Sequence, residues 1–334
     1  MSATMPLFSV IVPVYNVAPY LAECLDSVLS QSCADWECFC VDDGSRDGSG
    51  SLLDVYARRD ARFRITHQPN AGVSSARNRA LDTAHGQWVW FVDGDDRLRE
   101  GALGMLQGAL VEANDPQVAA VAFTFKEGVS VPTVWPEVKP PYVTSERTLT
   151  AWWHFRLSAF RTLFRRDAIG DLRFKRYSIG EDCLFSAMFF FRISRWMMWD
   201  APLYFYRVRQ GSAMHSRPCA RGVTDWFLVQ RDFLDLLGTD GRLDKVGGGR
   251  ELYLPRWAMD FYYTSGEMFF RMTLRDMRQC YDLWLDNLRL IEAWHPCRRY
   301  KRIVLAILRH WRSPLLARML VAWPLWLRRV LRLP

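Results

Sequence analysis

The sequence predicts an α/β fold with a mostly parallel, Rossmann-like sheet flanked by helices. Four short apolar runs recur at regular spacing in the N-terminal part of the chain, and each is continuous rather than alternating, as in strands covered on both faces. Helical patterns lie between the runs, and repeated strand–helix alternation is typical of parallel strands joined by right-handed crossovers. The four runs span residues 8–14, 36–41, 63–66 and 88–92.

Helices are expected in the three connections between these strands. The first begins near Pro19, a residue that suits a first helical turn, and carries apolar residues on one face. The second is centred on Leu52 and Leu53, and the third runs from Val73 until shortly before Gly86, a suitable C-cap residue.

Beyond the fourth run the pattern is less regular. Residues 118–125 indicate a further strand, a proline-rich loop follows, and helical patterns with many aromatic residues extend over 152–199 and 252–290. Gly247–Gly249 marks a flexible joint. With 50% hydrophobic and 14% aromatic residues, the 334-residue chain has the composition of a folded protein.

Neither the cysteines nor the N-terminus indicate secretion. The eight cysteines include no C-x-x-C pair, so neither a zinc site nor a disulfide framework is expected. No basic residue precedes the first apolar run, so the N-terminus does not resemble a signal peptide. We therefore expect a protein of the reducing cytoplasm.

The net charge of +8 is concentrated at the C-terminus. Residues 295–334 carry ten Lys and Arg and no acid, so the rest of the chain has a net charge of −2. This distribution argues against a basic domain face, and no nucleic-acid partner is expected. Arginines interrupt every apolar run before it reaches the roughly 18 residues that span a bilayer. A basic, tryptophan-bearing amphipathic tail fits an anionic membrane surface, and the alternative is a terminal helix packed on the domain.

Polar clusters follow all four predicted strands. Because parallel strands present their carboxyl ends at one edge, where ligands of such sheets bind, we expect the four clusters to form one site. No G-x-G-x-x-G or Walker A sequence is present, so neither a dinucleotide fingerprint nor a P-loop explains this edge. The clusters are residues 13–16, 42–45, 68–72 and 93–96.

The last of these clusters places three carboxylates, Asp93, Asp95 and Asp96, directly after an apolar strand. Their mutual repulsion raises their pKa values unless a cation compensates. Oxygen ligands of this kind suit Mg²⁺ or Mn²⁺, which take one or two carboxylates and share the remaining positions with phosphates. A solvated Asp-Gly turn is the alternative, and the common edge favours the metal.

The ordered set of motifs resembles the inverting GT-A-fold glycosyltransferases of family 2, a large bacterial family that transfers sugars from nucleotide donors. The resemblance covers about residues 7–215, whereas residues 220–334 match no family that we identify. The motifs, in chain order, are Ser9–Asn16, Val41–Ser45, Gly72–Asn78, Asp93–Asp96 and Gly180–Asp182.

The resemblance implies a nucleotide-sugar site. Pro13 and Tyr15 would contact the base, with the Tyr15 ring as a stacking face. Asp43 would accept a hydrogen bond from a uracil-type N–H or from the ribose, unless it only forms an Asx turn ahead of Gly44. Arg77 would bind the diphosphate or the base.

A metal site follows from the same resemblance. Asp93 and Asp95 correspond to the D-x-D element of the family, in which Asp95 ligates Mg²⁺ or Mn²⁺ and Asp93 approaches the ribose or a metal-bound water. Asp96 is either a third ligand or, as we favour, the N-cap of a helix that starts near Leu98. His215 would complete the metal shell, as a histidine does in some relatives, or be polar surface.

The resemblance makes Asp182 the general base and Glu181 a supporting or acceptor-contacting residue, because direct displacement needs a carboxylate opposite the leaving group. Both acids also suit the positive end of a following helix, which is the structural alternative. Arg207 or Arg209, in a softer motif after the last predicted strand, would reach the donor phosphates unless they belong to a solvated strand end.

The domain order follows from the same motifs. Residues 1–215 would form the GT-A catalytic domain, with a nucleotide-sugar half over about 7–115 and an acceptor half over about 116–215. A helical region over 216–294 and the basic tail over 295–334, which would associate with membrane, complete the chain.

The function expected from the resemblance is metal-dependent, inverting transfer from a nucleotide-sugar, a UDP-sugar above all, to a hydroxyl of a lipid-linked or surface-polysaccharide glycan. The enzyme would work as a peripheral protein on the cytoplasmic face of the cell membrane. The alternatives are a nucleotidyltransferase or sugar-nucleotide hydrolase on a similar fold, and an inactive membrane-bound adaptor.

The basic tail yields a direct test. Deletion of residues 295–334 is expected to abolish flotation of the protein with anionic liposomes, because the ten cations and the buried apolar area both supply membrane affinity. Equal flotation of the truncated and the full-length chain would contradict this expectation.

Overall fold

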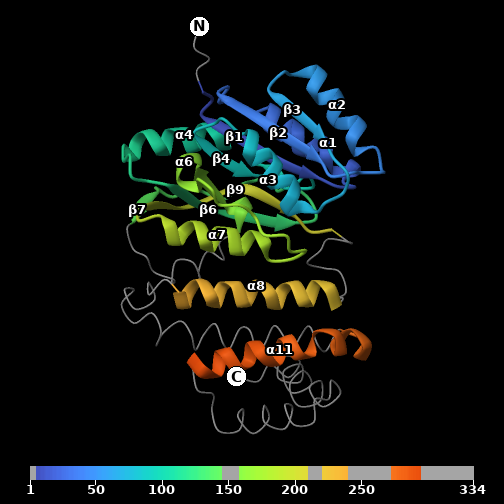
Figure 1. The fold of residues 1–334 in the computed structure, drawn as a ribbon. Coiled ribbons are helices and arrows are strands. Elements are labelled where there is room, and N and C mark those ends of the chain that lie inside the picture. The colour runs from blue at the N-terminus through green and yellow to red at the C-terminus, as the bar shows by residue number, and fades with distance from the viewer. Residues whose placement is uncertain (1–4, 145–157, 210–219, 240–271, 295–334) are drawn as a thin grey trace. The chain divides into compact units, whose positions relative to one another are not determined.

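A computed structural model describes residues 5–144, 158–209, 220–239 and 272–294 (Figure 1). The chain divides into two compact units. The first unit comprises residues 1–176 and 181–212, and the second comprises residues 177–180 and 213–334.

The first unit begins with the predicted parallel strands. β1 (Phe8–Val14) pairs in parallel with β2 (Trp36–Asp42) on one side and with β4 (Trp88–Phe91) on the other, and β3 (Phe63–His67) extends the sheet beyond β2. Val10 thus lies opposite Cys38 and Trp90. Strands β1, β2 and β4 are almost wholly buried because helices cover both faces, which explains their continuous apolar sequences, whereas the edge strand β3 is only partly buried.

The connecting helices are α1 (Ala18–Leu29), α2 (Ser49–Arg59) and α3 (Val73–Thr83). Proline lies in the first turn of α1, as predicted. Gly48 and Gly72 precede α2 and α3 with φ values of 93° and 90°, a region that favours glycine.

The helix expected near Leu98 begins later. Arg97–Leu98 forms the short strand β5, and α4 (Ala102–Ala113) starts only after Gly101. Leu98 pairs with Tyr204 of β9 (Trp196–Arg207), so a partner distant in sequence overrides the local helical pattern.

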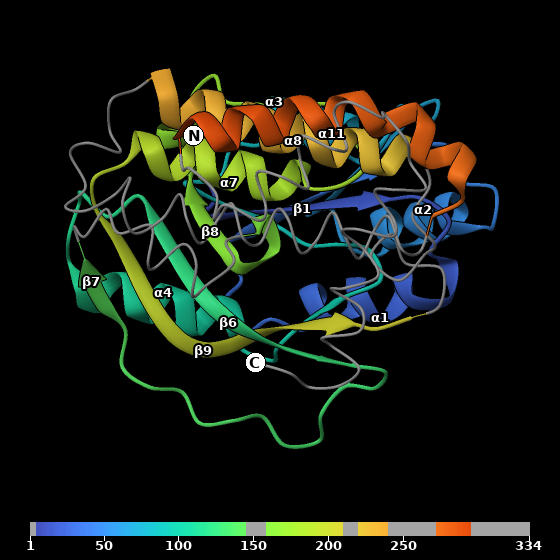
Figure 2. The ribbon, with the colours of Figure 1, turned by 90° about the horizontal axis from the view of Figure 1, so that it is seen from below.

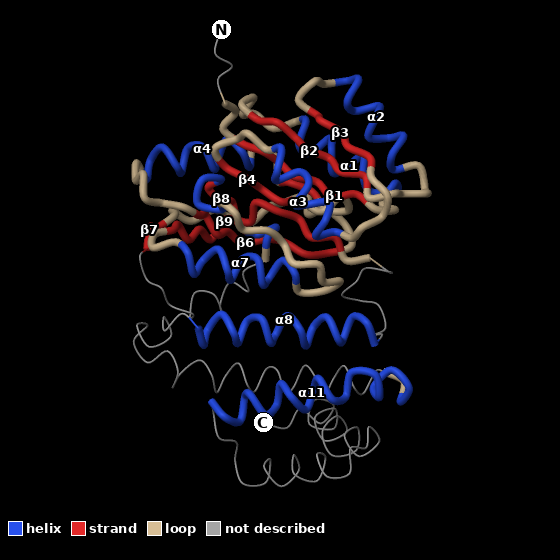
Figure 3. The backbone as a smooth tube through the Cα atoms, in the orientation of Figure 1, coloured by secondary structure: helices blue, strands red, loops and turns tan. Residues whose placement is uncertain are grey.

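The second half of the sheet is mixed. β6 (Ala120–Gly128) runs parallel to β9, whereas β8 (Thr162–Arg165) lies antiparallel between β4 and β6. β7 (Tyr142–Thr144) pairs with β9, and the path through the described strands is β3-β2-β1-β4-β8-β6-β9-β5 (Figure 3).

The fold class is therefore confirmed as α/β, but the helical expectation for 152–199 is only partly right. Within its described part, α7 (Glu181–Arg192) is the long helix, with the short 3₁₀ turn η1 (Ala159–Arg161) and α6 (Arg166–Ile169). Strands β8 and the start of β9 also fall here, because buried strands and buried helices share the same apolar composition.

Two hydrophobic layers enclose the sheet. One face packs against α1, α2 and α4, and the other packs against α3, α6 and α7 (Figure 2). Alternate β1 residues serve the two layers: Val10 and Val12 join the first, and Ile11 joins the second. A shift of one residue would move the β1 side chains into the wrong layer, so the pairing register of the strands is fixed. The carboxyl ends of the parallel strands β1, β2, β3 and β4 therefore meet at one edge of the sheet.

The strand order changes direction at β1. Strands β2 and β3 follow on one side of it, and β4 lies on the other. Such a switch point leaves a crevice at the carboxyl ends of the two central strands, where α/β sheets bind ligands. The segments leaving β1 and β4 here are the predicted base-binding residues and the triple acid.

The second unit contains the described helices α8 (Ala220–Thr239) and α11 (Leu274–Trp294). The Asn287 side chain donates a hydrogen bond to the Phe227 carbonyl at 2.9 Å, and the Tyr177 hydroxyl donates to Asp232 at 2.7 Å. The predicted glycine joint, His215 and the basic tail lie outside the described residues.

In the part of the chain that the structure describes, no helix combines the length and the apolarity needed to cross a bilayer.

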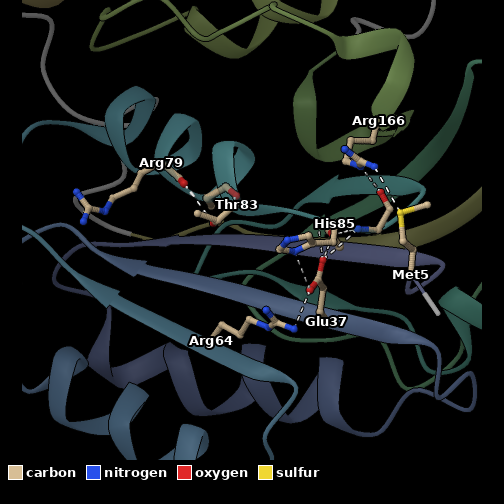
Figure 4. A network of polar contacts seen from close by, with 10 residues as sticks. Met5, Glu37, Arg64, Arg79, Thr83, His85 and Arg166 are labelled. Atoms are coloured by element: carbon tan, nitrogen blue, oxygen red, sulfur yellow. Dashed lines mark hydrogen bonds and ion pairs between the residues drawn. The ribbon is translucent and has the colours of Figure 1, made fainter. Parts of the chain in front are cut away.

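Glu37 ties the first two strands to the turn before β4 (Figure 4). Its side chain is 3% exposed, and its Oε1 accepts hydrogen bonds from the Ser9 hydroxyl at 2.7 Å and from the backbone N–H groups of His85 at 2.7 Å and Gly86 at 3.0 Å. Its Oε2 lies 3.4 Å from the Arg64 guanidinium. One carboxylate therefore satisfies three buried or half-buried donors.

Replacement of Glu37 tests this role. We expect Glu37→Ala to lower the free energy of unfolding by about 3 kcal/mol, because it leaves buried donors without an acceptor. Glu37→Gln keeps an oxygen at Oε1 and should cost less than half as much. Urea unfolding of both variants gives the comparison, and equal destabilisation by the two would contradict the proposed hydrogen-bond role.

Candidate active site

The loops that follow β1 and β2 hold each other in place. The Asn16 amide side chain accepts a hydrogen bond from the Arg46 N–H at 2.8 Å, and the Asn16 N–H donates to the Ser45 hydroxyl at 3.0 Å. Pro13 is half-buried, and the Tyr15 side chain is 50% exposed beside these bonds. An exposed ring on a fixed loop can serve as a stacking face.

Asp42 and Asp43 organise the neighbouring loops. Asp42 accepts hydrogen bonds from the Ser45 N–H and from a His67 ring nitrogen, both at 2.9 Å, and these bonds outweigh burial and lower the pKa of Asp42. Asp43 is 2% exposed. Its carboxylate accepts the N–H groups of Ala71 and Gly72, both at 2.8 Å, just before α3.

Asp43 thus fixes the start of the helix that carries Arg77. Gln68 donates a further bond to Asp43 at 2.7 Å, so both carboxylate oxygens already hold the loop over residues 68–72. The predicted contact of Asp43 with the base or ribose stays a prediction.

Two of the three acids after β4, Asp93 and Asp95, are paired with arginines from distant elements. Arg77 of α3 donates to Asp93 Oδ1 at 2.8 Å. Arg209, just beyond β9, donates from Nε to Asp95 Oδ2 at 2.6 Å. Burial and the neighbouring Asp93 nevertheless raise the pKa of Asp95 against the pull of Arg209. The repulsion anticipated from the sequence is therefore only partly relieved.

Asp96 was expected to be the N-cap of a helix, but this prediction is wrong, because α4 begins only at Ala102 and its N-cap is Gly101. It is 1% exposed and accepts the Tyr204 hydroxyl at 2.6 Å and the Arg207 N–H at 2.7 Å, so it anchors β9 to the end of β4. Burial, together with the charges of Asp93 and Asp95, raises its pKa well above the ordinary value. Both carboxylate oxygens of Asp96 therefore accept hydrogen bonds that hold β9 in place.

The Glu181–Asp182 pair opens α7 and reaches the same edge. Arg77 donates to Glu181 Oε1 at 2.7 Å. Burial and the adjacent Asp182 raise the pKa of Glu181 to about 7 despite this ion pair. The pKa of Asp182 is also raised, first by burial, while the charge of Arg77 opposes the rise and that of Asp93 adds to it. Asp182 therefore shares one electrostatic environment with the D-x-D element.

Arg77 is the centre of this arrangement. Its side chain is 6% exposed, and its guanidinium bridges Asp93 and Glu181 while lying 5.3 Å from the centroid of the Phe174 ring. Burial works against the charge, but the two carboxylates raise the pKa of Arg77. The residue lies at the predicted edge, yet the structure directs its two terminal nitrogens to protein carboxylates. Its contact with donor phosphates stays a prediction.

The acids at the end of β4 fit a divalent cation of the predicted type. Asp93 Oδ1 and Asp95 Oδ2 are taken by arginines, whereas the second oxygen of each accepts no hydrogen bond from another residue in the described ranges. Within those ranges, no three His, Cys, Asp or Glu side chains group to hold an ion. Two carboxylates, completed by phosphate and water, are the donor set that Mg²⁺ commonly takes.

Sequence reasoning missed two residues of the site. Tyr204 reads as an ordinary strand residue, yet its hydroxyl links Asp96 to the Asp93 N–H, which donates to it at 3.1 Å. Glu23 of α1 accepts Arg207 at 2.7 Å. No local signal marks either residue. Their contacts form only because β9, which contains Tyr204 and Arg207, lies beside segments more than a hundred residues earlier in the chain.

Residues 9–173 match the family model described as glycosyl transferase family 2. The chain therefore carries a glycosyl transferase family 2 domain, as its motifs predicted.

A relative agrees with this assignment. EpsJ of Bacillus subtilis, named as an uncharacterized glycosyltransferase, is 36% identical over 227 residues, which are 62% of this chain and 63% of EpsJ. The match thus spans less than two thirds of that relative.

Two solved structures share the fold. Staphylococcus aureus TarS 1–349 in complex with UDP-GlcNAc superposes with a TM-score of 0.70 at 22% identity, over 91% of this chain and 87% of TarS 1–349. The mannosyltransferase PcManGT of Pyrobaculum calidifontis, in complex with GDP-Man and Mn²⁺, gives a TM-score of 0.52 at 16% identity, over 99% and 89%. The likeness to TarS confirms the GT-A fold.

The Arg77 bridge predicts a large loss of stability on substitution. Arg77→Met is expected to lower the free energy of unfolding by about 3–5 kcal/mol, because it leaves Asp93 and the buried Glu181 without their cation. Adding Glu181→Gln should recover part of the loss, since it removes one uncompensated charge. Denaturant unfolding measures both effects.

Arg79→Met provides the control, because Arg79 is exposed on the same helix. Its stability should stay within about 0.5 kcal/mol of the wild type. A loss in Arg77→Met no larger than in Arg79→Met would exclude the bridge as a stabilising contact.

Proposed function

We propose that the protein is an inverting glycosyltransferase that moves a sugar from a nucleotide-sugar to a hydroxyl group. The observation that carries this proposal is the bridge from Arg77 to Asp93 and Glu181, which brings the D-x-D element and the Glu-Asp pair into one site. A donor-binding element and a basic carboxylate at one sheet edge are what direct displacement at an anomeric carbon requires.

The donor is a nucleotide-sugar bound across the ends of β1 and β4, and a UDP-sugar is the leading candidate. Tyr15 offers its exposed ring to the base, and Pro13 lies beside it. The complexes of TarS with UDP-GlcNAc and of PcManGT with GDP-Man support a nucleotide-sugar, since both proteins share this fold.

Asp95 and Asp93 would hold Mg²⁺ or Mn²⁺ through their carboxylate groups, each of which has one oxygen paired with an arginine in the structure. When bound, such an ion stabilises the negative charge that grows on the departing diphosphate. Support comes from the Mn²⁺ complex of PcManGT, a protein that shares this fold, and from the position of Asp93 and Asp95 together at the end of β4.

Asp182 serves as the general base. The acceptor oxygen bonds to the anomeric carbon as the bond from that carbon to the diphosphate breaks, and the hydroxyl proton passes to the Asp182 carboxylate. Attack from the face opposite the leaving group inverts the configuration. Burial raises the pKa of Asp182 toward the working pH, which suits a base that must also release its proton. Glu181, bound by Arg77, keeps this end of α7 in position.

The acceptor is a lipid-linked or surface-polysaccharide glycan, and the enzyme works at the cytoplasmic face of the cell membrane. The basic tail supports the location, because it carries ten cations and no acid.

Two isosteric substitutions separate the roles of the acids. Asp182→Asn is expected to lower kcat at least 100-fold, because it removes the proton acceptor, while binding of UDP with Mn²⁺ stays close to that of the wild type. Asp95→Asn should weaken Mn²⁺-dependent UDP binding itself. Release of UDP from UDP-GlcNAc and calorimetric UDP titration measure the two steps. Full activity of Asp182→Asn would refute the assignment of the base.

A further inference from the structure

Arg209 occupies the carboxylate that the proposed function gives to the metal. Its Nε lies 2.6 Å from Asp95 Oδ2, and the two side chains are 23% and 18% exposed. A charge-assisted bond of this length is among the stronger hydrogen bonds in proteins. Any divalent cation that binds Asp95 must therefore compete with a cation that belongs to the chain.

Arg207 lies beside it but is held in a different way. Its Nε donates to the Asp95 carbonyl at 2.9 Å, and its terminal nitrogen donates to Glu23 at 2.7 Å. Its N–H also binds Asp96, and its side chain is only 9% exposed. Arg207 thus joins β9 to α1 and to the loop after β4, and among the described residues none of its side-chain bonds involves a carboxylate proposed to ligate metal.

Within the residues that the structure describes, Arg209 makes fewer contacts with the fold than Arg207 does. The last backbone bond before it is that of the Val208 N–H to the Gly128 carbonyl at 2.8 Å, and β9 ends at Arg207. Its guanidinium lies 5.5 Å from the centroid of the Tyr20 ring, within the range of a cation–π contact. Arg209 is therefore the arginine that can leave its carboxylate without disturbing β9.

We propose that Arg209 is an exchangeable counter-ion of Asp95, displaced when a divalent cation and a nucleoside diphosphate bind together. This inference rests on the proposed function. If a metal ion without a nucleotide displaced Arg209, the guanidinium would lose its anionic partner. Displaced by a metal–diphosphate complex, it gains phosphate oxygens in place of the carboxylate. Metal binding is thereby made dependent on the nucleotide, and the coupling must be reciprocal.

Mn²⁺ and UDP are suitable probes for this coupling. In the wild type, Mn²⁺ alone should bind weakly and UDP should tighten its binding. In Arg209→Met, Mn²⁺ alone should bind about tenfold more tightly, the equivalent of the loss of one charge-assisted competitor, and the tightening by UDP should shrink by a similar factor. Arg209→Lys, which keeps a cation, should retain much of the wild-type coupling.

Arg58→Met is the matched control, because it removes the same charge from an exposed position in the last turn of α2. Mn²⁺ titrations followed by electron paramagnetic resonance, with and without UDP, give both affinities for each variant. If Arg209→Met binds Mn²⁺ no more tightly than Arg58→Met, the exchange is excluded. If the wild type binds no Mn²⁺ even with UDP, the metal-dependent function fails as well.

A second readout separates exchange from simple repulsion between charges. In protein labelled with ¹⁵N-arginine, the Nε–H resonance of Arg209 should shift when Mg²⁺ and UDP are added together, whereas that of Arg207 should stay in place. Asp95→Asn should shift the Arg209 resonance without ligand, because it removes the charged acceptor. An Arg209 resonance that does not respond to Mg²⁺ and UDP would overturn the proposal.

Discussion

Compensation of the carboxylates at the end of β4 is the constraint on which the site depends. Three acids within four residues cannot all stay charged at a half-buried strand end without nearby cations. Arg77 forms an ion pair with Asp93, and Arg209 forms one with Asp95. Asp96 instead accepts hydrogen bonds from the Tyr204 hydroxyl and the Arg207 N–H. Each acid thus recruits a different part of the fold.

This compensation also assembles the rest of the site. Arg77 reaches Asp93 because Asp43 fixes the start of α3, and its second nitrogen holds Glu181 at the start of α7. The D-x-D element and the Glu181–Asp182 pair therefore share one guanidinium. Under the proposed function, a change at any of these positions would act on binding, on chemistry and on stability together.

The fold was predictable where its pattern is local. The four parallel strands and their helices follow from continuous apolar runs and from a proline in a first turn, and the structure places them where they were expected. Prediction failed at Leu98 and in residues 152–199, where β5, β8 and β9 pair with strands far along the chain. Pairing of that kind leaves no periodic signal, since a buried strand and a buried helix have similar composition.

The sequence by itself determined the fold class and the edge at which Asp93 and Asp95 lie, because the carboxyl ends of parallel strands must coincide. The family, and with it the expectation that Asp182 joins this edge, came from the resemblance of the motifs. Only the tertiary structure decided which charges face one another. It turned Arg77 toward Asp93 and Glu181, gave Asp96 to β9 rather than to a helix, and placed Arg209 on Asp95. Ion pairs form between side chains that the fold brings within about 3–4 Å, and sequence spacing carries no record of that approach.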